Sequence, residues 1–190
     1  MNEELIKSYI KNEIDILSAI DIDSINKLIS LIDMVYQRGA TIYVCGNGGS
    51  ALTASHISCD FNKCLNELYG NKFNVVCLND NIGVITALAN DISYQDIYYR
   101  QLVNKLKQED LLITISGSGN SANVIKVAEY AKSIGTNVVS LTGFDGGQLK
   151  TLSDFDINIP IANMQIVEDI HLMINHLIVW SMLMNKSKKE

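Results

Sequence analysis

The chain has 190 residues, of which 47% are hydrophobic and 19% are charged, a balance that excludes an intrinsically disordered chain. Its formal net charge is −6 and its basic residues are scattered, which argues against a nucleic-acid-binding surface. The sequence shows no apolar signal segment, no apolar run of membrane-spanning length and no C-x-x-C pair, so we expect a cytoplasmic protein with reduced thiols and no membrane partner.

The first 38 residues are predicted to form two helices, because apolar residues recur at a helical spacing within residues 3–38. Residues 21–24, Asp-Ile-Asp-Ser, predict the N-cap of the second helix. A helical pair this apolar needs a partner surface. We therefore expect residues 1–38 to serve oligomerisation and residues 39–190 to form an α/β core.

The rest of the chain alternates between β-branched segments and segments with helical periodicity. Strands are predicted at residues 41–45, 73–78, 111–116, 137–142 and 156–161. Helices are predicted at residues 49–65, 83–88, 97–106, 120–134 and 167–184. This alternation favours one α/β domain, a three-layer sandwich around a mostly parallel five-stranded sheet with two extra N-terminal helices. Ligands of such sheets bind at the carboxyl ends of the strands.

A glycine-rich loop follows the first predicted strand, with the sequence Cys-Gly-Asn-Gly-Gly-Ser-Ala at residues 45–51. Glycines allow backbone N–H groups to approach an anion, and the following helix N-terminus favours negative charge. Gly46, Gly48 and Ala51 also fit the dinucleotide fingerprint G-x-G-x-x-A, but the second strand ends too late to supply its acidic partner. A plain glycine-rich turn remains a further alternative.

A second loop, Ser-Gly-Ser-Gly-Asn-Ser at residues 116–121, follows the third predicted strand and opens a helix. Its three hydroxyls and free amides match the oxygens of a phosphate. An N-cap would explain one of these serines but not three. Because neither loop contains the Gly-Lys-Ser/Thr of a P-loop, a sugar monophosphate fits better than a nucleoside triphosphate.

Two pairs of side chains are candidates for the chemistry. His56 and Asp60 are four residues apart on a predicted helix and share one face, and Glu168 and His176 lie about two turns apart on the last predicted helix. Such a set can hold Zn²⁺ or a similar divalent ion, and it can equally move a proton between two carbons. Asp169 is a rival to Glu168, because it aligns more closely with His176 on an ideal helix.

Three motifs in this order resemble the sugar isomerase (SIS) domain, with its flavodoxin-like sheet: Cys-Gly-Asn-Gly-Gly-Ser, Ile-Ser-Gly-Ser-Gly-Asn-Ser and Leu-Thr-Gly-Phe-Asp-Gly-Gly. More narrowly, nearly the whole chain is similar to the phosphoheptose isomerases. The resemblance implies a homotetramer that converts sedoheptulose 7-phosphate to D-glycero-D-manno-heptose 7-phosphate through an enediol, for the activated heptose of lipopolysaccharide or capsule.

The resemblance also implies roles for individual residues. It implies a zinc ion held by His56, Asp60, Glu168 and His176, with Asp60 as the base and His176 as the acid. It further implies substrate contacts from both loops, from an Asn-Asp pair after the apolar run 84–89 and from the last helix. These residues are Asn47, Gly48, Gly49, Ser50, Asn90, Asp91, Ser116, Gly117, Ser118, Asn120, Ser121 and Glu168.

This chain departs from the family pattern at three of these positions. Asp60 and Glu168 stand where the family usually has Glu and Gln, and Gly117 stands where Thr or Ser is common. The shorter acid at position 60 leaves a possible gap to the substrate carbon, so Glu168 is a second candidate for the base. The serines of the second loop remain, so we expect phosphate binding to persist.

Alternatives to this isomerase come from other classes of protein. Relatives with the same fold act as non-catalytic tetramers that regulate replication initiation by binding DnaA, and such a regulator has no need of the acid, base and metal residues. A sugar-phosphate sensor would require residues for a DNA-binding segment. An isomerase of a different sugar phosphate also remains open.

Overall fold

The centre of the molecule is a five-stranded parallel sheet with the strand order β2-β1-β3-β4-β5. The computed structural model describes residues 2–70 and 72–187. The strands are β1 (Thr41–Gly46), β2 (Asn74–Cys77), β3 (Leu111–Ser116), β4 (Asn137–Gly143) and β5 (Phe155–Ile159). The predicted α/β class with a five-stranded sheet is therefore confirmed, and each strand agrees with its predicted range to within two residues.

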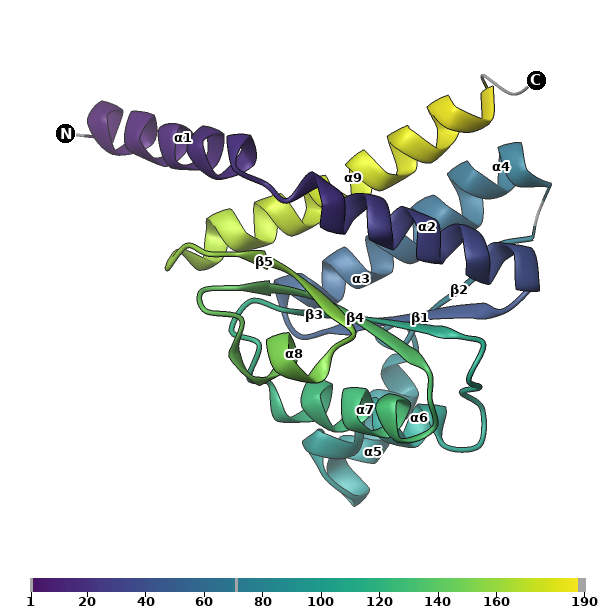
Figure 1. The fold of residues 1–190 in the computed structure, drawn as a ribbon. Coiled ribbons are helices and arrows are strands. Elements are labelled where there is room, and N and C mark those ends of the chain that lie inside the picture. Colours follow the sequence, from purple (N-terminus) through teal and green to yellow (C-terminus); the bar gives the residue numbers. More distant parts are fainter. Residues whose placement is uncertain (1, 71, 188–190) are drawn as a thin grey trace.

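Helices cover both faces of this sheet, as Figure 1 shows. On one face lie α2 (Ile22–Arg38), α3 (Gly49–Asp60) and α9 (Met164–Ser187). On the other lie α5 (Ile82–Asp91), α6 (Tyr99–Leu102), α7 (Ala122–Ser133) and α8 (Gly147–Leu152). The π-helical segment η1 (Phe61–Leu65) joins α3 to α4 (Asn66–Tyr69), and the 3₁₀-helix η2 (Tyr94–Asp96) precedes α6. The remaining helix, α1 (Asn2–Ser18), extends from one edge of the molecule (Figure 1).

Alternation of side chains along the strands explains the two-sided core. In β3 every residue is buried, with Leu111, Ile113 and Ile115 in the hydrophobic cluster shared with α2, α3 and α9. Leu112 lies in the second cluster, which it shares with α6 and α7. Successive side chains of a strand point to opposite faces, so a strand covered on both faces is apolar almost throughout.

The helical segments differ from the prediction in two ways. The helix predicted at residues 97–106 is wrong in its extent, because only Tyr99–Leu102 is α-helical. Val103 leaves the helical path with ψ 126°, and Asn104 follows with a left-handed φ of 61°. The helix α8 was not predicted, because six residues are too few to show a helical periodicity.

The second N-terminal helix is capped as expected. The Asp21 carboxylate accepts hydrogen bonds from the backbone N–H groups of Asp23 and Ser24, and Gly39 ends the helix in a left-handed conformation. Six residues of α2 are buried, among them Leu28 and Ile32. This helix therefore belongs to the core of the domain.

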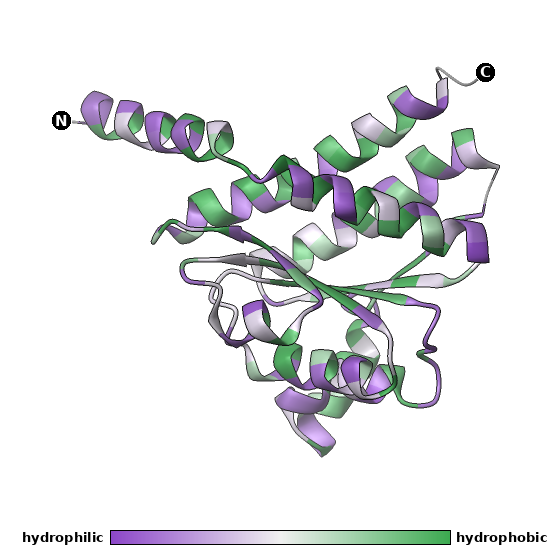
Figure 2. Cartoon of the chain, viewed as in Figure 1, coloured by the Kyte–Doolittle hydropathy of each residue, from purple (hydrophilic) through white to green (hydrophobic). Residues whose placement is uncertain are grey.

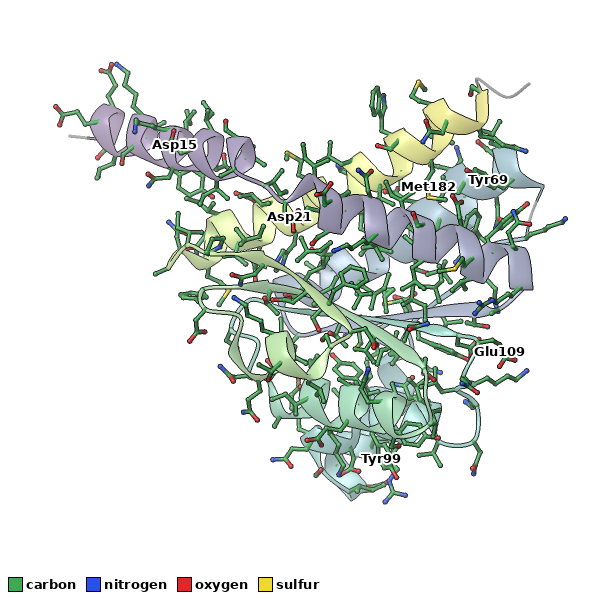
Figure 3. All side chains as sticks on the ribbon, viewed as in Figure 1. Asp15, Asp21, Tyr69, Tyr99, Glu109 and Met182 are labelled. Atoms are coloured by element: carbon green, nitrogen blue, oxygen red, sulfur yellow. The ribbon has the colours of Figure 1, made fainter. Side chains whose placement is uncertain are left out.

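The first N-terminal helix behaves differently, because no residue of α1 is buried against the described part of the chain. Tyr9, Ile16 and Leu17 are partly buried against the core, whereas four other large apolar side chains of α1 are 49% to 65% exposed: Leu5, Ile6, Ile10 and Ile14. Figure 2 shows apolar and polar residues along α1, and in Figure 3 the side chains around Asp15 project into open space. A helix of this length is marginal in water without a partner for its apolar face.

The last helix, α9, packs into the core of the domain. Within the described residues, α9 alone is long and apolar enough to cross a membrane, yet half of its apolar window is buried inside the domain. Ile166, Ile170 and Ile174 of α9 lie in the hydrophobic cluster beside the sheet. This is the burial pattern of a core helix.

A buried polar cluster lies where β4, β5 and α9 meet. Asp156 Oδ2 accepts a hydrogen bond from Thr142 Oγ1 at 2.6 Å, and its Oδ1 is buried with no partner among the described residues. Burial raises the pKa of Asp156 to about 6, against the opposing effects of Thr142 and Lys150. His171 is fully buried with Nε2 3.0 Å from the Thr142 carbonyl oxygen, and burial lowers its pKa to about 4.

The raised pKa of Asp156 predicts a stability that depends on pH. Folding favours the neutral carboxyl, so its contribution is fully present below the unfolded pKa and is lost as the pH rises through about 6. The variant Asp156→Asn stays neutral and keeps an acceptor for Thr142. Because solvent screens this partly exposed group, we expect a gain on the order of 1 kcal/mol at pH 8, or roughly 2 to 4 °C in Tm.

Thermal unfolding of wild type and variant at pH 8 and pH 5 measures this effect. The gain should be smaller at pH 5, where the wild-type carboxyl is mostly protonated. Glu109→Gln is the control, since Glu109 is an exposed carboxylate (Figure 3) and should show no such dependence. An equal gain for Asp156→Asn at both pH values would contradict the assignment.

Candidate active site

The strand order creates one crevice at the centre of the sheet. β1 and β3 are neighbours, and the chain leaves β1 toward β2 on one side and β3 toward β4 on the other. Such a point of reversal is where open parallel sheets bind ligands, outside the carboxyl ends of the strands. Both glycine-rich loops predicted from the sequence begin there, after Gly46 and Ser116.

The first loop leaves a helix N-terminus free. Gly48, the N-cap of α3, has φ 55° and makes no capping hydrogen bond through a side chain. The loop is braced from β2, because Asn79 Oδ1 accepts from the Gly46 N–H at 3.3 Å and Asn79 Nδ2 donates to the Gly46 carbonyl at 2.9 Å. The first amides of α3 thus remain available to an anion.

The second loop brings serine hydroxyls together at the start of α7. Ser121 is the N-cap of α7, yet its side chain makes no capping hydrogen bond and its Oγ lies 3.2 Å from Ser116 Oγ. The Ser121 hydroxyl therefore does not cap α7. Gly119 has φ 63° and lies so close to the Gly146 carbonyl that a Cβ would overlap it, so the third motif supports this loop directly.

The two loops line one pocket of about 260 Å³. Nine of the predicted substrate-binding residues line it, together with Met164: Asn47, Gly48, Gly49, Ser50, Ser116, Gly117, Ser118, Ser121 and Glu168. Asn120 instead lines a neighbouring apolar pocket and accepts a hydrogen bond from the Gln148 N–H. Asn90 and Asp91 lie outside both pockets, exposed and hydrogen-bonded to each other at 2.8 Å. The binding roles of all these residues stay predictions.

Met164 accounts for the glycine at position 117. A Cβ on Gly117 would overlap the Met164 sulfur and lie 3.1 Å from its Cε. A Thr or Ser, which is common at this position, would fit only if the Met164 side chain moved. The side chain of Met164, from the start of α9, occupies the space beside the loop instead.

Glu168 packs against the first loop. A Cβ on Gly49 would lie 2.6 Å from the Glu168 carboxyl carbon, so only glycine permits this approach. Glu168 also lines a small adjoining pocket with His56. The carboxylate therefore lies between the two glycine-rich loops and His56.

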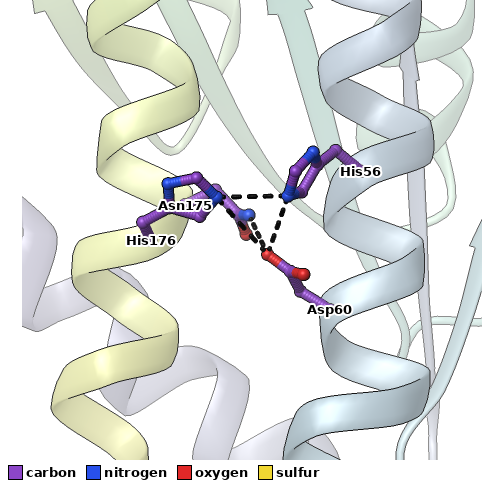
Figure 4. A network of polar contacts seen from close by, with 4 residues as sticks. All are labelled: His56, Asp60, Asn175 and His176. Atoms are coloured by element: carbon purple, nitrogen blue, oxygen red, sulfur yellow. Dashed lines mark hydrogen bonds and ion pairs between the residues drawn. The ribbon is translucent and has the colours of Figure 1, made fainter.

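Three of the residues predicted for catalysis and metal binding lie close together where α3 crosses α9: His56, Asp60 and His176 (Figure 4). Asp60 Oδ2 lies 3.3 Å from His56 Nε2 and 3.8 Å from His176 Nε2, and the two imidazole Nε2 atoms are 3.1 Å apart. These three residues can hold a metal ion, because their ligand atoms all lie within 4.8 Å of one another. Glu168, the fourth expected ligand, is not in this group.

The rival carboxylate on α9 has a different partner. Asp169 Oδ2 accepts a hydrogen bond from Tyr9 Oη on α1 at 2.5 Å. This contact, together with nearby Asp169 charge and burial, raises the pKa of the Tyr9 hydroxyl to about 12. Asp169 therefore connects α9 to α1, whereas Glu168 faces the loops.

Two asparagines of the site were not found from the sequence. Asn123 exchanges two hydrogen bonds of 2.9 Å with Asn47 and so joins α7 to the first loop. Asn175 donates to Asp60 Oδ2 at 2.7 Å. Both are asparagines inside amphipathic helices, which carry no motif, so only the packing of one element on another reveals their partners.

Comparison with known proteins agrees with this fold. The SIS domain model matches residues 8–143, so the molecule is a SIS domain protein. A phosphoheptose isomerase of Aneurinibacillus thermoaerophilus is 35% identical over 184 residues, covering 92% of this chain and 90% of that protein. One of Helicobacter pylori (strain P12) is 36% identical over 148 residues, covering 78% and 76%. The chain belongs to the phosphoheptose isomerase family.

A solved structure gives the same result for the fold. The phosphoheptose isomerase GmhA from Neisseria gonorrhoeae superposes with a TM-score of 0.87 at 25% sequence identity, covering 96% of this chain and 98% of that chain. The resemblance predicted from the three motifs is confirmed.

The contact between Gly49 and Glu168 predicts a sensitive position. Gly49→Ala should displace the Glu168 carboxylate from the pocket and weaken binding of sedoheptulose 7-phosphate, the expected substrate, at least about tenfold. Isothermal titration calorimetry measures the affinity. Gly83→Ala is the matched control, because a Cβ there meets only Asn81 Oδ1 at 3.5 Å, and its affinity should stay within about a factor of two. Unchanged binding by Gly49→Ala would remove this contact from the site.

Proposed function

We propose that the chain is an aldose–ketose isomerase that converts sedoheptulose 7-phosphate to D-glycero-D-manno-heptose 7-phosphate, for the synthesis of activated heptose. The observation that carries this proposal is the triangle of His56, Asp60 and His176 beside a pocket formed by two anion-binding loops. Membership of the phosphoheptose isomerase family supports the same reaction.

The pocket supplies orientation. The free N-termini of α3 and α7 and the serine hydroxyls bind the phosphate, and Glu168 and the first loop bind the sugar hydroxyls. Fixing the phosphate in this way holds the other end of the sugar toward the helix crossing. Orientation of this kind supplies a large share of the rate of such reactions.

The proton transfers follow from the residues at the crossing. Asp60, with Glu168 as the second candidate, removes a proton from C1 of the ketose while His176 donates one to the C2 oxygen, giving the enediol. Return of a proton to C2 and loss of the proton from the C1 hydroxyl then yield the aldose. Carboxylate and imidazole side chains are among the groups that most often act as general base and general acid in such transfers.

Zinc is the metal we propose for the three ligands. The ligand atoms of a tetrahedral zinc with bonds of 2.0 to 2.1 Å are roughly 3.3 to 3.4 Å apart, and those of His56, Asp60 and His176 are 3.1 to 3.8 Å apart. Three protein ligands leave a fourth position open, as in catalytic zinc sites. An ion bound through Nε2 of His176 would take the place of the proton on that atom, and it would stabilise the negative charge that develops on the C2 oxygen.

A non-catalytic regulator is the second candidate function. It is less well supported, because a protein-binding tetramer has no use for two imidazoles and a carboxylate gathered within 4.8 Å of one another beside a sugar-phosphate pocket. We also propose a cytoplasmic location, which the four free cysteines support, since thiols stay reduced in that compartment.

Turnover tests the proposed function directly. An NMR time course with sedoheptulose 7-phosphate should show aldoheptose 7-phosphate, with activity lost on chelation and restored by zinc. Asp60→Asn should lower kcat at least a hundredfold, on the order of what a general base supplies, whereas Glu168→Gln should retain turnover if Asp60 is the base. Cys59→Ser is the control, because Cys59 is the exposed neighbour of Asp60. A folded wild type without turnover would favour the regulator or another substrate.

We further propose that the chain forms a homotetramer. Exposed apolar side chains occur on two opposite layers: on α1, α2 and α9, for example Ile10 and Trp180, and around α5, for example Ile82 and Ile92. A closed tetramer with dihedral symmetry needs two different self-complementary interfaces, and two separate apolar surfaces meet that requirement.

Light scattering tests this assembly. The wild type should have four times the mass of one chain, and Ile10→Asp, on the apolar face of α1, should lower that mass. Ser8→Asp adds the same charge on the polar face of α1 and should leave the tetramer intact. A monomeric wild type would contradict the proposal.

A further inference from the structure

We propose that Asn175 is a positioning residue that holds the Asp60 carboxylate in the triangle with the two histidines. Asn175 is 2% exposed, and its Nδ2 donates to Asp60 Oδ2 at 2.7 Å (Figure 4). The same oxygen faces His56 and His176. Asn175 therefore contacts the one carboxylate oxygen on which the arrangement of the site depends.

The approach to Asp60 comes from two sides. The side chains of His56 and His176 are 43% and 53% exposed, so they reach the carboxylate from the solvent side. Asn175 immediately precedes His176, and neighbouring residues of a helix point about 100° apart, so its amide reaches the carboxylate from the buried side of the contact between α3 and α9. One turn of α9 thus supplies both the imidazole of His176 and the amide of Asn175 that holds the Asp60 carboxylate.

The orientation of the Asn175 amide indicates that it recognises a hydrogen-bond acceptor on Asp60. A side-chain amide donates only through Nδ2 and accepts only through Oδ1. Turning the amide over would place Oδ1 against a carboxylate oxygen, two acceptors facing each other. The acceptor oxygen of Asp60 therefore selects this orientation of Asn175.

Packing alone does not account for an asparagine at this position. Asn175 Oδ1 is buried with no hydrogen-bond partner among the residues that the structure describes, which is unfavourable for a polar atom. A leucine of similar size would remove that unpaired acceptor and fill the same space. What the leucine lacks is the donor to Asp60, so the contact with the carboxylate is the feature that the asparagine provides.

The role we assign acts through Asp60. A carboxylate at the end of a short side chain can rotate, and one short hydrogen bond from a rigid helix restricts that rotation. Residues that orient metal ligands in this way typically change metal affinity or activity by about 10- to 100-fold when they are replaced. Asn175 touches neither the phosphate loops nor the pocket that they line, so its loss should affect kcat and zinc affinity more than KM.

Crystal structures of wild type and Asn175→Leu give the test that is independent of activity. In the variant we expect the Asp60 carboxylate to leave the triangle, with Oδ2 no longer near both Nε2 atoms. An unmoved Asp60 would overturn the proposal. This readout separates the inference from the proposed function on which its kinetic part rests, because a wild type without turnover leaves the structural comparison fully informative.

A double-mutant cycle gives the second readout, with zinc affinity measured by competition with a chelator and kcat measured by NMR. Asn175→Leu should weaken zinc binding and lower kcat about tenfold or more in the wild-type background. In the Asp60→Asn background it should change zinc affinity less than about twofold, since the group through which it acts has been replaced. Equal losses in both backgrounds, or none in either, would show that Asn175 only packs.

Ser58→Ala is the matched control for stability. Ser58 is a buried polar residue on α3 that donates to the Val75 carbonyl at 3.2 Å and has no contact with the triangle. Its loss should lower Tm while zinc affinity and kcat stay unchanged. A fall in zinc affinity equal to that of Asn175→Leu would mean that any weakening of α3 disturbs the site, which would overturn the positioning role.

Discussion

The pairing of β1 with β3 at the centre of the sheet is the contact on which the rest of the site depends. In this parallel register Gly46 lies opposite Ile115, so the two strands end side by side and release their loops at the same level. The two helices that follow, α3 and α7, then begin at one crevice with their N-termini free of side-chain caps. A shift of this register would separate the loops and remove the common anion pocket, because each loop alone presents only half of it.

The second constraint is the crossing of α3 and α9 over one face of the sheet. These helices are more than a hundred residues apart in sequence, and their contact brings together the two imidazoles and Asp60. Glycine at position 49 allows Glu168 to approach the first loop at this crossing, and Asn175 holds Asp60 from the buried side. The geometry of the His56, Asp60 and His176 group therefore depends on helix packing, whereas the geometry of the pocket between the two loops depends on the sheet.

The side chains that surround positions 60 and 117 explain why this chain departs from the family pattern there. Gly117 and Met164 occupy one space between them, so the loss of a hydroxyl at position 117 accompanies a bulky side chain from α9. Asp60 has a shorter side chain than the Glu that is usual in the family. The buried side-chain amide of Asn175 restrains its carboxylate. Two of the three departures, at positions 60 and 117, thus each have a specific structural neighbour.

The sequence by itself determined the five strands, the two loops and the family, because hydrophobic periodicity and glycine-serine motifs are local features that survive without knowledge of contacts. It also indicated His56 with Asp60, since residues four apart on a helix share a face. Only the tertiary structure decided that Glu168 faces the loops while Asp169 contacts Tyr9, and that Asn123 and Asn175 support the site. The physical reason is that these contacts join elements distant in sequence, so their partners are set by how helices pack and not by spacing along the chain.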